Sequence, residues 1–254
     1  MKQSRNLTWV CVSLFVTGLI VVLSSEAKTD LTNKNVVGIW LFDEIKGDKA
    51  KDTSENGLDG KVEGKVKVVD GKFGQALQFN ADGYVEIPFN ELLNIKHMTL
   101  MCWVNAEQGG AVQIHRWAPP AYTLEIFQNK TTPVIMTAGG FKYNQPPKPT
   151  PLKEWVHLAG TYDGKNLIAY ENGKAVESLK HEGDINAGKD VVRIGARTDN
   201  AGGKFQGVLD EVAIFGEALT QQEIQDIMND GFKGVLAVSP ESKLATTWAY
   251  LKQN

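Results

Sequence analysis

Residues 155–177 read WVHLAGTYDGKNLIAYENGKAVE, and this stretch carries the clearest local structural signals of the chain. The runs Val156–Tyr162 and Leu167–Glu171 are rich in β-branched and aromatic residues, which favour strands. Asn172-Gly173 supplies the two positive-φ positions that a tight hairpin turn requires. We therefore predict a hairpin whose second strand is Lys174–Glu177.

The same pattern of short apolar runs, closed by Gly, Asn, Asp or Pro, extends over the chain from Val36 onward. Helical periodicity is almost absent from it. The other predicted strands are Val36–Phe42, Gly60–Val69, Ala76–Phe79, Tyr84–Ile87, Met98–Asn105, Ala111–His115, Tyr122–Phe127, Pro133–Thr137, Val191–Ile194 and Gly207–Phe215. So many strands predict an all-β sandwich of two antiparallel sheets.

A single helix is expected in the domain, directly after the last strand. Thr220 and Glu223 stand at the two reciprocal positions of a capping box, and apolar residues follow at helical spacing. Gly231 is suited to end this helix.

The first residues have the order of a secretory leader. Lys2 and Arg5 precede an apolar run over residues 7–23, and small residues follow up to Ala27. This order predicts a signal peptide over residues 1–27. The run is long enough to leave an uncleaved membrane anchor as the alternative. Both readings predict a secreted, periplasmic or cell-surface protein.

Residues 28–236 are predicted to form one domain, and residues 237–254 a short amphipathic tail. In the tail, Leu244, Trp248 and Leu251 recur at helical spacing, so we expect it to dock to a larger cell-surface assembly.

The composition argues against a nucleic-acid partner, because the formal net charge is −3 and no basic cluster is present. Cys102 is the one cysteine outside the leader, so an internal disulfide is excluded after cleavage. Its apolar setting predicts a buried small hydrophobe.

Three segments, in order along the chain, carry a family resemblance: residues 74–88, residues 155–176 and residues 193–219. Together they resemble laminin G-like (LamG) members of the concanavalin A-like lectin/glucanase superfamily. The resemblance implies a jelly-roll sandwich with a short helix after the last core strand. It also implies that the first and last strands pair, which would place Trp40–Glu44 beside Leu209–Phe215.

This superfamily includes glycan hydrolases, whose usual mechanism needs two carboxylates about 5 to 9 Å apart. Glu125 stands alone in its predicted strand. Asp210 and Glu211 are adjacent, so strand alternation should point them to opposite faces. We therefore predict a protein that is not an enzyme, with a hydrolase as the weaker alternative.

A structural calcium ion is a further expectation, on the condition that the first and last strands pair. Asp43 and Asp210 would then meet at one edge of the fold, with Asp52 able to fold over them. Carboxylates and carbonyl oxygens are the ligands that Ca²⁺ prefers. The alternative is that these residues are solvated turn and edge acids.

Two loops carry aromatic residues suited to stacking on a sugar ring. Trp117 follows Arg116 in one loop, and Tyr143 precedes Asn144 in the other. We predict that these four residues form the ligand surface. The alternative is that the aromatic rings cover the core of the sandwich.

These signals favour a non-catalytic module that binds a carbohydrate or a glycoprotein. A protein-interaction or cell-surface structural domain is the alternative, because the fold does not decide between the two.

Overall fold

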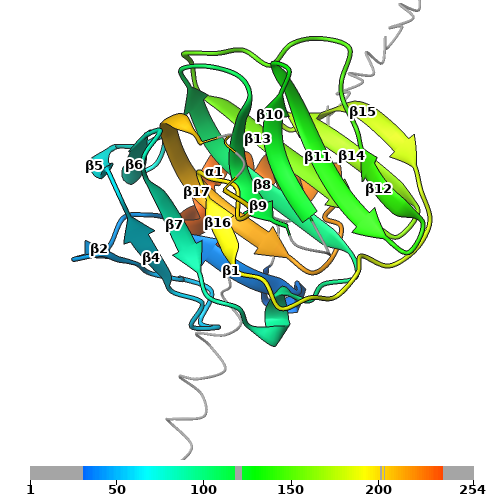
Figure 1. Cartoon of the computed structure of the whole chain (residues 1–254), viewed down its shortest axis with the longest axis horizontal. Helices are drawn as coiled ribbons and strands as arrows, with labels where there is room; N and C mark the ends of the chain where they lie inside the picture. Colours follow the sequence, from blue (N-terminus) through cyan, green and yellow to red (C-terminus); the bar gives the residue numbers. More distant parts are fainter. Residues whose placement is uncertain (1–30, 118–121, 201, 203, 237–254) are drawn as a thin grey trace, which may run out of the picture.

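The computed structural model describes residues 31–117, 122–200, 202 and 204–236. Within them the chain forms a sandwich of two antiparallel sheets with one C-terminal helix (Figure 1). The predicted leader (residues 1–27) and the predicted tail (residues 237–254) lie outside the described residues. No helix in the described part has the length and apolar character needed to cross a membrane.

One sheet has eight strands, with β17 at its centre. In order across the sheet they are β15 (Lys174–Lys180), β14 (Asn166–Glu171), β13 (Val156–Tyr162), β8 (Met98–Ala106), β17 (Gln206–Phe215), β6 (Gln75–Asn80) and β5 (Val66–Asp70), while β1 (Val36–Trp40) also pairs with β17. On one side β17 pairs with β8; on the other it pairs first with β6 and then with β1.

The other sheet has nine strands. They are β12 (Gly140–Tyr143), β11 (Lys130–Thr137), β10 (Tyr122–Phe127), β9 (Ala111–Arg116), β16 (Val192–Ile194), β7 (Tyr84–Ile87), β4 (Gly60–Glu63), β3 (Lys49–Ala50) and β2 (Ile45–Lys46). The short helices η1 (Leu31–Asn33) and η2 (Glu91–Leu93) lie in the connections.

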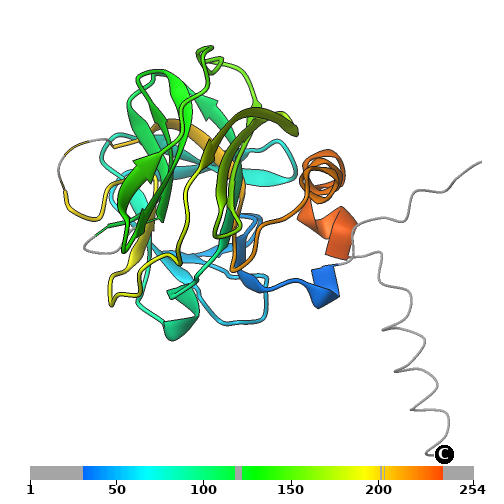
Figure 2. The ribbon, with the colours of Figure 1, turned by 90° about the vertical axis from the view of Figure 1, so that its right-hand side faces the viewer.

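The main core lies between the sheets and includes Trp40, Phe79, Tyr122 and the free, buried Cys102. A second cluster lies between the eight-stranded sheet and α1 (Gln221–Leu236). Figure 2 shows α1 on one side of the sandwich and the strands of the nine-stranded sheet on the other. The outer face of the nine-stranded sheet is therefore free of the helix.

The two sharpest local predictions are confirmed. Asn172 (φ 47°) and Gly173 (φ 70°) form the turn between β14 and β15. Thr220 N donates to Glu223 Oε2 (2.7 Å) and Glu223 N donates to Thr220 Oγ1 (3.3 Å), which is the predicted capping box. Gly231 (φ 67°, ψ 165°) has a non-helical conformation that ends the first segment of α1, as predicted, and a second helical segment follows it to Leu236.

Two strand predictions were wrong in their bounds. The predicted strand Gly60–Val69 is β4 and β5, which belong to different sheets because Gly64 (φ 74°) turns the chain between them. β1 does pair with β17, but its register joins Trp40 to Val212 and its strand ends there. Phe42 (φ 62°) turns the chain away, so Asp43 and Glu44 do not continue the strand.

Candidate functional site

Strand alternation aligns four side-chain positions on the outer face of the nine-stranded sheet. The registers pair Thr123 with His115 and with Val134, and Val134 with Tyr143. These positions therefore form a row across β9, β10, β11 and β12. Residues two apart along a strand share a face, so Glu125 and Phe127 lie on the same side as Thr123.

This row is the floor of a groove with a volume of about 400 Å³. Its size falls within the range of small-ligand sites, about 300 to 1,000 Å³. The lining residues come from four strands and two loops: His115, Trp117, Thr123, Glu125, Phe127, Thr132, Val134, Phe141, Tyr143 and Arg197.

Aromatic rings form one wall of the groove. The ring centroids of Trp117 and Phe141 are 5.4 Å apart in an edge-to-face arrangement, and those of Phe141 and Tyr143 are 5.6 Å apart. Phe141 and Tyr143 are 43% and 48% exposed. Contact among the rings fixes their positions while leaving apolar surface available to a ligand.

Glu125 contributes a carboxylate to the groove. Burial raises the pKa of Glu125, and the nearby charge of Arg197 opposes that rise. Among the described residues, no side chain or backbone group donates a hydrogen bond to this carboxylate. Arg197 itself is held by Asp199, to which it donates from Nε (2.9 Å) and Nη2 (2.6 Å).

His115 lines the groove with a ring whose Nε2 is buried. Its Nδ1 accepts a hydrogen bond from Thr198 N (3.0 Å), so the proton of the neutral ring is on Nε2. Burial lowers the pKa of His115 to about 4, and the charge of Arg197 adds to this effect. The ring is therefore neutral at pH 7, and its buried Nε2 has no hydrogen-bond partner in the described structure.

Two of the four predicted ligand residues lie outside the groove. Arg116 is fully buried, and its guanidinium donates to Leu93 O (3.1 Å), Gly188 O (2.9 Å) and Asn94 Oδ1 (2.9 Å). Asn144 is also buried and donates from Nδ2 to Leu167 O (2.9 Å). Both side chains hold loops together and lie outside the groove, whereas Trp117 and Tyr143 line it.

A family model for the concanavalin A-like lectin/glucanases superfamily, of the laminin G type, matches residues 79–225. The chain belongs to this superfamily. No curated protein matches the sequence.

Solved structures show the same superfamily fold at low sequence identity. Domain 4 of AbnA, a GH43 extracellular arabinanase from Geobacillus stearothermophilus solved in complex with arabinotriose, is 21% identical with a TM-score of 0.66, over 77% of this chain and 98% of that one. The binding domain of Paraclostridial Mosquitocidal Protein 1 is 18% identical (TM-score 0.59), over 77% of this chain and 52% of that one.

The binding domain of Botulinum Neurotoxin DC, in complex with SialylT, is 15% identical (TM-score 0.59), over 78% of this chain and 51% of that one. This member of the superfamily therefore spans about half of the length of the two toxin binding domains. Identities this low establish the shared fold and nothing finer.

The carboxylate oxygens of the expected calcium ligands already accept hydrogen bonds from the protein. Asp52 Oδ1 accepts from Ile39 N (3.0 Å) and Ser54 N (2.9 Å), and its Oδ2 accepts from Leu58 N (2.9 Å). This carboxylate therefore holds the loop after β3, with its charge directed at backbone donors.

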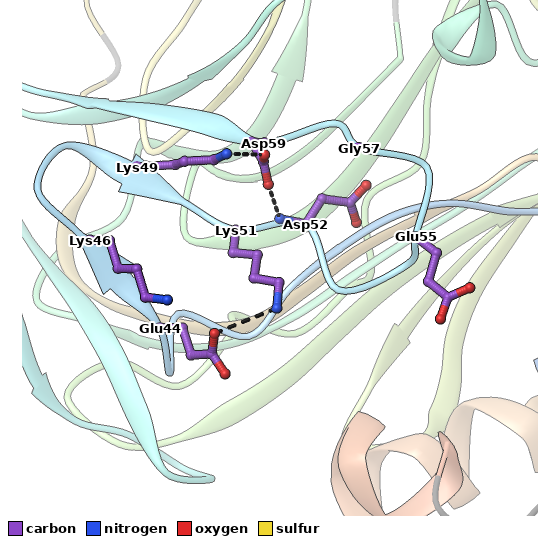
Figure 3. A pocket seen from close by; sticks show the side chains of 8 residues that line it. All are labelled: Glu44, Lys46, Lys49, Lys51, Asp52, Glu55, Gly57 and Asp59. Carbon is purple, nitrogen blue, oxygen red and sulfur yellow. Dashed lines mark hydrogen bonds and ion pairs between the residues drawn. The ribbon is translucent and has the colours of Figure 1, made fainter.

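Asp52 also borders a second hollow, of about 370 Å³, which is lined by charged residues (Figure 3). In it Lys49 binds Asp59 (2.5 Å), Lys51 lies 3.5 Å from Glu44, and Asp52 N donates to Asp59 Oδ1 (2.9 Å). Most of its charges therefore already have a partner of opposite sign or a backbone donor, and no aromatic side chain lines it.

Asp43 and Asp210 do lie near each other, since the charge of Asp43 contributes to raising the pKa of Asp210. However, Asp43 binds Lys233 Nζ (2.8 Å) and accepts from Gln75 N (2.7 Å), while Asp210 accepts from Phe73 N (2.9 Å). In the described part of the chain no three His, Cys, Asp or Glu side chains are grouped as metal ligands. Asp43, Asp52 and Asp210 therefore do not fit a shared calcium site.

The expected opposition of Asp210 and Glu211 was also wrong. Glu211 has φ 50°, and the register of β17 with β8 shifts between Asp210 and Ala213, so a bulge interrupts strand alternation here. Both carboxylates are buried, and burial raises the pKa of each to about 7. Glu211 Oε2 accepts from Phe232 N (2.6 Å), which attaches the end of α1 to the sheet.

Proposed function

We propose that this protein is a non-catalytic binding module whose groove, on the outer face of the nine-stranded sheet, binds a glycan or the glycan of a glycoprotein. The observation that carries the proposal is the wall formed by Trp117, Phe141 and Tyr143, beside the polar groups of Glu125 and His115. Aromatic faces pack against the apolar face of a sugar ring, while donors and acceptors beside them bind its hydroxyl groups.

The charges in the groove support binding without hydrolysis. Glycoside hydrolysis usually needs a pair of carboxylates, one on each side of the scissile bond. Glu125 is the one carboxylate among the described residues that line the groove. Asp210 and Glu211 do not line it, and both accept hydrogen bonds from backbone groups.

The location and the wider assembly of the protein are part of the same proposal. The leader at residues 1–27 supports export, after which the module would act outside the cytoplasm. The tail at residues 237–254, with its apolar residues at helical spacing, supports docking to a larger cell-surface assembly.

Binding of the purified protein to a glycan array tests the proposal. Trp117→Ala and Tyr143→Ala should each weaken binding at least tenfold, because each removes part of the stacking surface. Leu92→Ala is the matched control, since Leu92 is 46% exposed and does not line the groove. Thermal melts of all three variants check that they remain folded.

The proposal fails if the wild-type protein binds no glycan, or if folded Trp117→Ala and Tyr143→Ala bind as tightly as Leu92→Ala. Binding of a protein ligand with no glycan attached, lost in the same two variants, would instead support a protein-interaction domain.

A further inference from the structure

The negative charge of Glu125 in the groove has no hydrogen-bonded cation beside it, and this restricts the charge of the ligand. Arg197 is the one cationic side chain among the described lining residues, and two hydrogen bonds join its guanidinium to the carboxylate of Asp199. His115 adds no positive charge at neutral pH, because burial lowers its pKa to about 4. Glu125 therefore has its negative charge uncompensated by a hydrogen-bonded cation.

The hydrogen-bonding groups of the groove fit hydroxyl groups. A carboxylate that receives no protein hydrogen bond accepts well from one or two sugar hydroxyls, because an ionised acceptor forms the stronger kind of hydrogen bond. His115 Nε2 is a buried donor without a partner. This donor is closed to solvent and lies out of reach of a ligand, so selection among ligands rests on the carboxylate of Glu125.

A negatively charged ligand fits these groups poorly. The carboxylate of a uronic or sialic acid, brought into the groove, would face Glu125 in a setting already partly removed from water. Facing like charges at an interface weaken binding strongly. The cation that would normally bind such a group, Arg197, is already bound to Asp199.

Resting on the proposed glycan-binding function, we infer that the groove selects uncharged glycans over acidic ones, with Glu125 accepting hydrogen bonds from sugar hydroxyls. Selection comes from Glu125, which attracts hydroxyl donors and repels carboxylates. The aromatic wall contributes affinity for either class, because stacking does not depend on the charge of the sugar.

The test uses an array that carries neutral oligosaccharides together with uronic acid oligosaccharides, each in its free-acid and methyl-ester form. An ester and its free acid share one carbon skeleton and differ in charge, so they isolate the charge of the ligand. We expect the ligands bound by the wild-type protein to be neutral, and any bound uronide ester to bind at least tenfold more tightly than its free acid.

The variant Glu125→Gln removes the charge and keeps the size of the side chain. It should weaken binding of neutral ligands by about tenfold and reduce the preference for ester over acid. Glu177→Gln on β15, in the other sheet, is the matched control for a half-buried glutamate and should leave both quantities unchanged.

The possible results separate this inference from the function on which it rests. Preferential binding of free acids by the wild-type protein, lost in Trp117→Ala, would overturn the inference and leave glycan binding at the groove intact. An unchanged preference in folded Glu125→Gln would also overturn it. Absence of binding to every glycan on the array would overturn the proposed function itself.

Discussion

Replacing Glu211 by glutamine should stabilise the protein at pH 8 and have a much smaller effect at pH 4. Glu211 lies at the bulge of β17, is 3% exposed, and accepts a hydrogen bond from Phe232 N, which the amide oxygen of glutamine can also accept. The charged groups around it are Asp210, Asp43 and Lys233. The substitution therefore removes a buried negative charge while it keeps the contact with α1.

The magnitude follows from the difference between the folded and unfolded states. Burial, with help from the charges of Asp210 and Asp43, raises the pKa of Glu211 from 4.5 to about 7. The folded protein therefore binds this proton more tightly than the unfolded chain does. As the pH rises from about 4.5 to about 7, the free energy of unfolding falls, by about 3 kcal/mol for this group.

Chemical denaturation of the wild-type protein and Glu211→Gln at pH 4 and pH 8 measures the effect. The difference in unfolding free energy between the two proteins should shift in favour of the variant by about 2 to 3 kcal/mol between the two pH values. Taking the change with pH cancels any constant effect of the amide. An exposed control, Glu55→Gln, should show almost no such change. The reasoning is refuted if the stability difference is the same at both pH values, or if Glu211→Gln loses stability relative to the wild-type protein as the pH rises.

Two further predictions concern residues that the sequence associated with ligands. Arg116→Met should lower the free energy of unfolding by more than about 3 kcal/mol, because carbonyl groups such as Leu93 O and Gly188 O lose their charged donor. Denaturant titration measures this free energy, and a decrease below about 1 kcal/mol contradicts the prediction. Excess chelator should leave the melting temperature of the protein unchanged, because Asp43, Asp52 and Asp210 are engaged by backbone or lysine donors. A reproducible decrease would show that an ion stabilises the fold.

The parts of the fold that sequence predicted well are those determined by a few neighbouring residues. The Asn172-Gly173 turn requires two positive-φ residues, and the Thr220–Glu223 capping box is complete within one helical turn. The bulge at Glu211 has no comparable local signal, because the mostly apolar sequence of β17 resembles that of a regular strand. Gly64 was a weak signal for the division between β4 and β5, since a glycine within a strand has several structural explanations.

Two of the predicted ligand residues, Arg116 and Asn144, lie outside the groove for a reason that the sequence already contained. Side chains alternate along a strand, so Arg116 lies on the opposite face from Trp117, and Asn144 from Tyr143. The same alternation along Tyr122–Phe127 would have found Glu125 on the face of Thr123 and Phe127. Arg197 could not have been found in this way, because its loop reaches the groove only through the packing of β16 beside β9.

The place of β17 at the centre of its sheet has a consequence for folding kinetics. This strand is the last of the described strands to be synthesised, yet β8, β6 and β1 all pair with it. The eight-stranded sheet therefore cannot assemble in the order of synthesis, and its earlier strands have no central neighbour until about residue 215 has emerged. Pairing over such separations in sequence slows folding, because a long loop must close before its contacts form. The sandwich therefore remains incomplete until β17 has been made.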